Sequence, residues 1–355
     1  MANPRESELS YPLGDTLPGP GEALDLLPGV RWVRMGLPFA LDHINLWLLR
    51  DVLDGREGWT IVDCGIHNDT TKANWERVFA ERLDGLPVLR VIATHFHPDH
   101  LGLGHWLTER WQCRLWISAT DYQLAKVASS STVGMGGEAA AAFFGSHGLT
   151  DSAALEKIRG RASYYPSMVP AIPAAFRRLM DGMTVRIGDH DWRCLVGYGH
   201  APEHISLFSQ TQGNGLGVMI AGDMVLPRIS TNVSVVDGEP EADPLQLYLD
   251  SLARLTALPA DTLVLPAHGK PFRGLHARID QLEQHHRERL AEVLEACTAK
   301  PCHAAELLPM MFRRPLDLHQ TTFAMGEAVA HLNRLWLGGL LRRTLDEDGI
   351  HRFSA

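Results

Sequence analysis

A dense cluster of metal-binding residue types follows one short apolar segment of the chain. Residues 89–94 (LRVIAT) are typical of a buried β-strand, and they run directly into HFHPDH. In that cluster His95 and His97 alternate, so both can face one point, whereas Asp99 and His100 come one turn later. Imidazole nitrogens and carboxylate oxygens are ligands for zinc, manganese and iron. We therefore predict a metal site at a strand end, where α/β folds carry their chemistry.

Three more residues of these types follow apolar segments later in the chain. His200 lies in VGYGHAPEH, Asp223 in MIAGDMV and His268 in LVLPAHG, each beside a glycine or a Pro–Ala turn. With the first cluster they give two histidine-rich half-sites, and Asp223 is placed to bridge them.

Strand-like and helical segments alternate along most of the chain, which predicts an α/β layered fold. Residues 119–181 are Ala-rich and interrupt this alternation, so we predict a helical insertion there, including PAAFRRLM near its end. A long helix, two shorter ones and an Asp-Gly hairpin follow, which suggests a small winged-helix-like C-terminal domain. We place a Pro- and Gly-rich lead-in at 1–28, the catalytic domain at 29–275 and the C-terminal domain at 276–355.

Composition narrows the classes of function. The net charge of −9 argues against a nucleic-acid-binding protein, which usually carries a basic excess. No apolar run is long enough to span a membrane. The five cysteines are scattered without zinc-finger spacing, and we find no signal peptide, so we expect a cytoplasmic protein with free thiols.

The ordered set H-x-H-x-D-H, His, Asp, His strongly resembles the metallo-β-lactamase superfamily over roughly residues 30–275. The resemblance implies an α/β fold, a four-layer αββα sandwich, with two divalent metal ions between its sheets. Zinc is the expected metal, and iron and manganese are the alternatives. The implied ligands are His95, His97 and His200 for the first metal, Asp99, His100 and His268 for the second, and Asp223 as the bridge.

The resemblance also implies a reaction. Two metals that share a hydroxide can attack a small-molecule ester, thioester or lactone, and Asp99 would orient that hydroxide as the catalytic residue. The segment GHAPEHISLF is similar to GHTxGH of glyoxalase II and its relatives, which hydrolyse thioesters. Asp223 stands where the best-known exported lactamases have a cysteine, which argues against antibiotic hydrolysis.

Two further residues are expected near the metals. Asp63, in IVDCG, matches an aspartate of the family that orients a ligand histidine. His204 is expected either behind the ligands or facing the substrate. The neighbouring Cys64 is expected to be a small buried residue and not a nucleophile.

The insertion and the tail leave the substrate open. Long insertions often form lids or binding loops, and this one offers an apolar substrate five side chains: Met135, Phe143, Phe144, Tyr164 and Tyr165. The same side chains could instead pack on the core or on a second subunit of a homodimer. The winged-helix-like tail suggests a metal-dependent endoribonuclease or phosphodiesterase as an alternative. Further alternatives are an iron-dependent oxygenase and a binding protein with a silent site.

Overall fold

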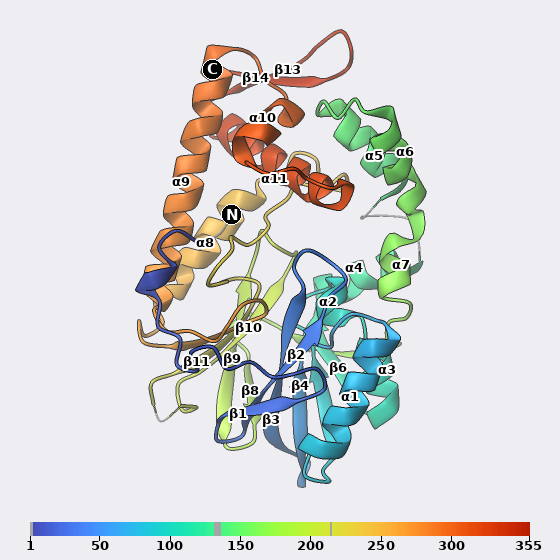
Figure 1. The fold of residues 1–355 in the computed structure, drawn as a ribbon, viewed down its shortest axis with the longest axis vertical. Coiled ribbons are helices and arrows are strands. Elements are labelled where there is room, and N and C mark those ends of the chain that lie inside the picture. The colour runs from blue at the N-terminus through green and yellow to red at the C-terminus, as the bar shows by residue number, and fades with distance from the viewer. Residues whose placement is uncertain (1–2, 131–135, 214) are drawn as a thin grey trace.

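The computed structural model describes residues 3–130, 136–213 and 215–355, and two β-sheets packed face to face form its centre (Figure 1). The first sheet runs in chain order: β1 (Ala23–Leu27), β2 (Val30–Gly36), β3 (His43–Leu53), β4 (Arg56–Val62), β5 (Val88–Ile92), β6 (Arg114–Ser118) and β7 (Phe176–Leu179). The second is ordered β12 (Leu263–Pro266), β11 (Val218–Gly222), β10 (His204–Ser209), β9 (His190–Gly197) and β8 (Thr184–Ile187).

Helices cover the outer face of each sheet. Helices α1 (Asp69–Arg82), α3 (Gly104–Trp111) and α4 (Ala119–Ser130) pack on the first sheet. Helices α8 (Pro244–Leu255) and α9 (Leu275–Ala299) pack on the second. A third apolar cluster lies between the sheets. The predicted αββα sandwich is therefore confirmed.

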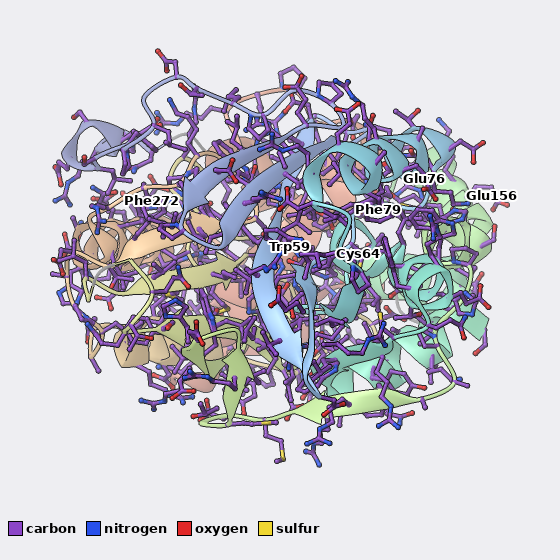
Figure 2. All side chains as sticks on the ribbon, turned by 90° about the horizontal axis from the view of Figure 1, so that it is seen from below. Trp59, Cys64, Glu76, Phe79, Glu156 and Phe272 are labelled. Carbon is purple, nitrogen blue, oxygen red and sulfur yellow. The ribbon has the colours of Figure 1, made fainter. Side chains whose placement is uncertain are left out.

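Alternate residues of the central strands face opposite sides of the first sheet, as strand geometry requires. Trp32 and Trp47 pack between the two sheets, whereas Val33 faces the helices. Cys64 and Phe79, both labelled in Figure 2, belong to the cluster under the helices. Burial raises the pKa of the Cys64 thiol well above its ordinary value. Cys64 is thus a packing residue and is not activated as a nucleophile.

A buried ion pair ties the first sheet to the second. The guanidinium of Arg90 on β5 donates to Asp51 on β3 through Nε at 2.8 Å and through Nη2 at 2.9 Å. Asp51 also accepts from the Thr60 hydroxyl at 2.6 Å and from the Gly188 amide, after β8, at 2.9 Å. Because every oxygen of the carboxylate is hydrogen-bonded, the buried charge is well compensated.

The predicted insertion is helical over most of its length. Helices α5 (Gly137–Ser146), α6 (Ser152–Arg159) and α7 (Tyr164–Met168), with the short 3₁₀ helix η2 (Gly160–Ser163), extend beside the C-terminal domain (Figure 1). Phe143 is buried in the apolar cluster of that domain. Helix α5 of the insertion therefore packs on the protein's own C-terminal part, whereas α4 packs on the first sheet.

The helical prediction for PAAFRRLM is wrong. Residues Phe176–Leu179 form β7, which pairs in parallel with β6 at the edge of the first sheet. The ring of Phe176 stacks on Tyr122, with centroids 3.9 Å apart. Intrinsic helix propensity, even that of alanine, is readily overridden by tertiary contacts, so backbone pairing and this stacking decide the structure.

The C-terminal part has the predicted helices and hairpin. After α9 come α10 (Ala304–Met311) and α11 (Leu318–Leu337), then β13 (Arg342–Leu345) and β14 (His351–Ser354), which pair antiparallel. Helix α9 runs from the sandwich into this part (Figure 1). The boundary at 275 stays a prediction, because one continuous helix crosses it.

The N-terminal segment, predicted as a Pro- and Gly-rich lead-in, packs against the sandwich. It contains a short 3₁₀ helix, η1 (Glu6–Glu8), and the edge strand β1. Leu9 is buried in the cluster under α8 and α9. Proline and glycine therefore mark turns around short elements here.

Within the described ranges, none of the helices combines the length and the apolar character needed to cross a membrane.

Candidate metal centre

Four different strand ends deliver the seven predicted ligands to one end of the sandwich. His95 follows β5, and His97 immediately precedes α2 (Pro98–Leu101), the turn of helix that carries Asp99 and His100. The other three follow the second sheet's strands: His200 after β9, Asp223 after β11 and His268 after β12. The structure brings all seven together in two groups that could each hold a metal ion.

The first group consists of three imidazoles and one carboxylate. His95 Nε2 lies 2.8 Å from His97 Nδ1, which in turn lies 3.1 Å from His200 Nε2. The two Nε2 atoms of His95 and His200 are 3.2 Å apart. Asp223 Oδ2 completes the group, 3.1 Å from His200 Nε2. Atoms that share a metal at about 2.0–2.1 Å are separated by about this much.

The second group shares Asp223 with the first. His268 Nε2 lies 3.4 Å from Asp99 Oδ2 and 3.3 Å from Asp223 Oδ1. His100 Nε2 lies 3.6 Å from Asp99 Oδ2 and 3.5 Å from Asp223 Oδ2. Asp223 therefore faces both groups, as its predicted bridging position requires.

Hydrogen bonds at the outer ring nitrogens fix how the histidines face the centre. The donor–acceptor pairs are His100 Nδ1 to Asp63 Oδ2 at 2.8 Å, His200 Nδ1 to Asn232 O at 2.7 Å and His268 Nδ1 to His43 O at 2.7 Å. When Nδ1 carries the proton, Nε2 of a neutral imidazole presents a lone pair to the centre, as a metal ligand must.

The electrostatics also fit a bound cation. Two buried atoms that face the centre, His100 Nε2 and Asp223 Oδ1, have no hydrogen-bond partner in the described part of the chain. Burial lowers the pKa of His97 to about 3, and the adjacent His200 adds to this. Burial raises the pKa of Asp99, but His100 and His268 outweigh it and lower that pKa to about 2. Burial lowers the pKa of His268, but Asp223 and Asp99 outweigh it and raise that pKa to about 10. His97 and Asp99 are therefore already in the forms that bind a metal, whereas a bound cation would displace the proton of His268.

Asp63 lies where a residue that orients a ligand should lie. Its Oδ1 accepts the Thr94 amide at 2.7 Å, and its Oδ2 accepts the Thr94 hydroxyl at 3.0 Å as well as His100 Nδ1. Its φ of +64° is in the left-handed region, which non-glycine residues seldom adopt. Such a conformation persists only where the surroundings hold it, and here three buried hydrogen bonds do so.

His204 lies behind the ligands and does not face the substrate side. It is fully buried, and its Nε2 accepts the backbone amide of Asp223 at 3.1 Å. A Cβ on Gly222 would come within 2.3 Å of the same nitrogen, and Gly222 has a φ of +52°. The glycine is therefore required for Asp223 to reach the centre above His204.

Three residues that support the ligands escaped the sequence analysis. Thr94 hydrogen-bonds Asp63, and the carbonyl of Asn232 accepts from His200. Asn45, fully buried in β3, donates from Nδ2 to the carbonyls of Pro266 and Gly269 on either side of His268. A lone amide within the apolar run INLWLL was a usable signal for Asn45, whereas no motif marks Asn232.

A pocket of about 460 Å³ opens beside the centre, and His97 and His200 form part of its wall. Most of its other lining is apolar and comes from the insertion, the loop after β9, residues 232–244 and α11. Phe144 and Tyr164 line this pocket, whereas Tyr165 is buried and its hydroxyl donates to Phe96 O at 2.6 Å. Met135 lies outside the described residues.

The fold and the centre define a class of protein: an αββα sandwich with a His/Asp cluster able to hold metal ions between its sheets. A family model described as the metallo-beta-lactamase superfamily matches residues 40–268, and one for a metallo-beta-lactamase-like C-terminal domain matches residues 290–355. The chain belongs to the metallo-β-lactamase superfamily.

Solved structures agree with this assignment. A beta-lactamase domain protein from Burkholderia ambifaria is 55% identical over 98% of both chains, with a TM-score of 0.93. A metallo-beta-lactamase family protein from Thermus thermophilus is 26% identical, covering 93% of this chain and 99% of its own, with a TM-score of 0.72. A Cronobacter sakazakii metallo-beta-lactamase, 17% identical over 78% of this chain and 95% of its own, has a TM-score of 0.52 and shares the fold. No curated protein matches the chain.

Proposed function

We propose that this protein is a two-metal hydrolase of a small-molecule carboxylic ester, thioester or lactone, with zinc as its metal. Members of the superfamily are mostly metal-dependent hydrolases, and the His/Asp cluster is able to hold metal ions. The observation that carries the finer proposal is the position of the pocket, whose wall includes His97 and His200. Pockets of about 300–1,000 Å³ with mostly apolar walls are typical of small-molecule sites.

Each ligand has a defined task in this proposal. His95, His97 and His200 would hold one metal, and a second group, Asp99, His100 and His268, would hold the other, with Asp223 between them. Two bound divalent ions would supply an activated water and polarise the substrate carbonyl. The Asp99 carboxylate, whose pKa is about 2, would accept a hydrogen bond from that water and so orient it.

The alternative of a nuclease has less support. Phosphate affinity needs several uncompensated cations, and two arginines of the hairpin are already paired. Arg343 pairs with Glu241, and Arg352 pairs with Asp346 at 2.8 Å. We therefore propose a small molecule, and not nucleic acid, as the partner of the centre.

Elemental analysis and an activity panel test this proposal. The purified protein should contain about two zinc ions per chain, whereas one iron and no zinc would point to an oxygenase. The panel compares thioesters, lactones and p-nitrophenyl esters with bis-p-nitrophenyl phosphate and single-stranded RNA. Turnover of the phosphodiesters alone would refute the proposed substrate class.

The Asp99→Ala variant tests the site itself. Loss of a residue that merely supports a ligand costs about 10–100-fold, so removal of Asp99 should lower kcat/KM by more than about 100-fold. Asp189→Ala is the matched control, because Asp189 is fully exposed and far from the seven ligands in the fold. Full turnover by Asp99→Ala would contradict the proposed role.

A further inference from the structure

The pocket beside the metal centre has an apolar surface that the fold leaves open. The side chains of Val236, Leu247 and Phe323 line it, and they remain 42–48% exposed. Deeper lining residues include Leu124, Ala140 and Phe144 of the insertion. Large apolar side chains that stay exposed around one concave surface are typical of a binding site.

The charges of the pocket nearly cancel. Arg161 on the insertion side faces a lining that also includes Asp237 and Glu239 from the loop before α8. The guanidinium of Arg161 lies 5.4 Å from the ring centroid of Tyr164. Away from the metal end, one cation with two carboxylates offers no excess positive charge to a polyphosphate group, so the group bound there carries little net charge.

A polar pair, Tyr164 and His319, also belongs to the lining. The Tyr164 hydroxyl lies 3.1 Å from His319 Nδ1, which joins the insertion to helix α11. The ring of His319 is held between Phe39, with centroids 5.0 Å apart, and Phe323, with centroids 4.9 Å apart. Because these contacts hold the Tyr164 hydroxyl and the His319 ring in place, the Tyr164 hydroxyl offers one positioned hydrogen bond to a bound molecule.

We propose that the pocket binds the acyl half of the substrate as an apolar chain or ring, while its carbonyl lies at His97 and His200. This inference rests on the proposed ester hydrolysis and names the substrate class within it. A volume of about 460 Å³ lies within the range of small-molecule sites. Medium-length acyl groups of low charge fit this space, and Tyr164 binds a polar atom of the same molecule.

An acyl series with one leaving group tests the proposal. p-Nitrophenyl acetate, butanoate, hexanoate and octanoate differ only in methylene groups, and each buried methylene should raise kcat/KM by about fourfold. Partial burial reduces this, so we expect the octanoate to exceed the acetate by at least tenfold. Equal kcat/KM for acetate and octanoate would overturn the pocket assignment and leave the proposed hydrolysis standing.

A pair of matched variants locates the effect. Val236 lines the pocket and is 47% exposed, whereas Val52 on β3 is 49% exposed and lies outside it. Val236→Trp should fill part of the space and lower the octanoate-to-acetate ratio of kcat/KM at least tenfold. Val52→Trp should alter neither substrate. Equal losses in both variants would overturn the proposal.

Ligand binding separates this proposal from the proposed function. Calorimetry compares octanoate with acetate on the zinc-loaded protein, so that the shared carboxylate contributes equally to both. Octanoate should bind at least tenfold more tightly, and Val236→Trp should remove the difference. If no ester is hydrolysed but this difference is found, the hydrolysis proposal fails and the acyl pocket stands. If octanoate and acetate bind equally, the acyl pocket is refuted.

Discussion

The support that Asp63 gives to His100 can be tested by one isosteric change. Asp63→Asn keeps the size of the side chain and suits the left-handed φ of +64°, which asparagine tolerates better than most residues. It removes the negative charge that accepts His100 Nδ1–H at 2.8 Å. The amide can instead turn an N–H toward this nitrogen, which favours the tautomer with a proton on Nε2. That tautomer cannot bind a metal through Nε2.

The size of the effect follows from the burial of the interaction. Asp63 is 1% exposed and His100 is 0% exposed, so water cannot replace the lost contact. Changes to the partners of metal-bound histidines typically cost about 10–100-fold in metal affinity, which is about 1.4–2.7 kcal/mol. The loss of zinc affinity should occur at the half-site formed by Asp99, His100 and His268. The half-site of His95 and His97 should bind zinc within about threefold of the wild type.

A zinc titration in competition with a chromogenic chelator measures both affinities on metal-free protein. Asp54→Asn is the matched control, because Asp54 also has a left-handed φ, +51°, but is exposed. Circular dichroism checks that each variant is folded. A folded Asp63→Asn protein with two unchanged zinc affinities would refute the argument that Asp63 sets the tautomer of His100.

Three further predictions concern the core, the C-terminal domain and the pocket. Arg90→Met leaves the buried Asp51 without its cation and should lower the free energy of unfolding by about 3 kcal/mol; denaturant unfolding with a loss under 1 kcal/mol would contradict this. Burial raises the pKa of Glu327 on α11 from 4.5 to about 7, so its contribution to stability is fully present below pH 4.5 and is lost as the pH rises through 7. The free energy of unfolding is therefore compared for Glu327→Gln and wild type in the presence of chelator. Between pH 5 and pH 8 the difference should shift in favour of Glu327→Gln by roughly 2–3 kcal/mol, and an equal difference at both pH values would refute this. Tyr164→Phe removes the hydroxyl that pairs with His319 and should lower kcat/KM about 2- to 10-fold, with the octanoate-to-acetate ratio unchanged; unaltered kcat/KM would exclude a substrate contact.

The order of apolar segments and metal-binding residue types along the chain was sufficient to predict the fold and the residue types of the metal centre. Each ligand follows an apolar strand, and strand ends on one side of a sheet converge in space. The cluster around His95 and His97 is local, so its geometry depends mainly on one strand and one turn. The later ligands, such as His200, are recognisable because few other residues of their type follow buried strands beside a glycine.

The errors and omissions have a common physical cause, because they depend on partners far away in the chain. Residues 176–179 form a strand through pairing with β6, which outweighs a weak local helix preference. Asn232 supports His200 through a backbone carbonyl, and a carbonyl leaves no trace in the residue type. Ser234, two residues later, packs against Gly326 of α11, where a Cβ would come within 2.7 Å. The C-terminal domain thus contacts the loop that holds a ligand.

The sequence by itself determined the superfamily, the layered sandwich and the residue types of the centre, since local patterns and their order encode all three. Only the tertiary structure decided the pocket. Its lining combines Phe144 of the insertion, Val236 of the loop before α8 and Phe323 of α11, which are separated by more than 80 residues from one another. A cavity is the space that packed elements leave between them, so no single stretch of sequence records it.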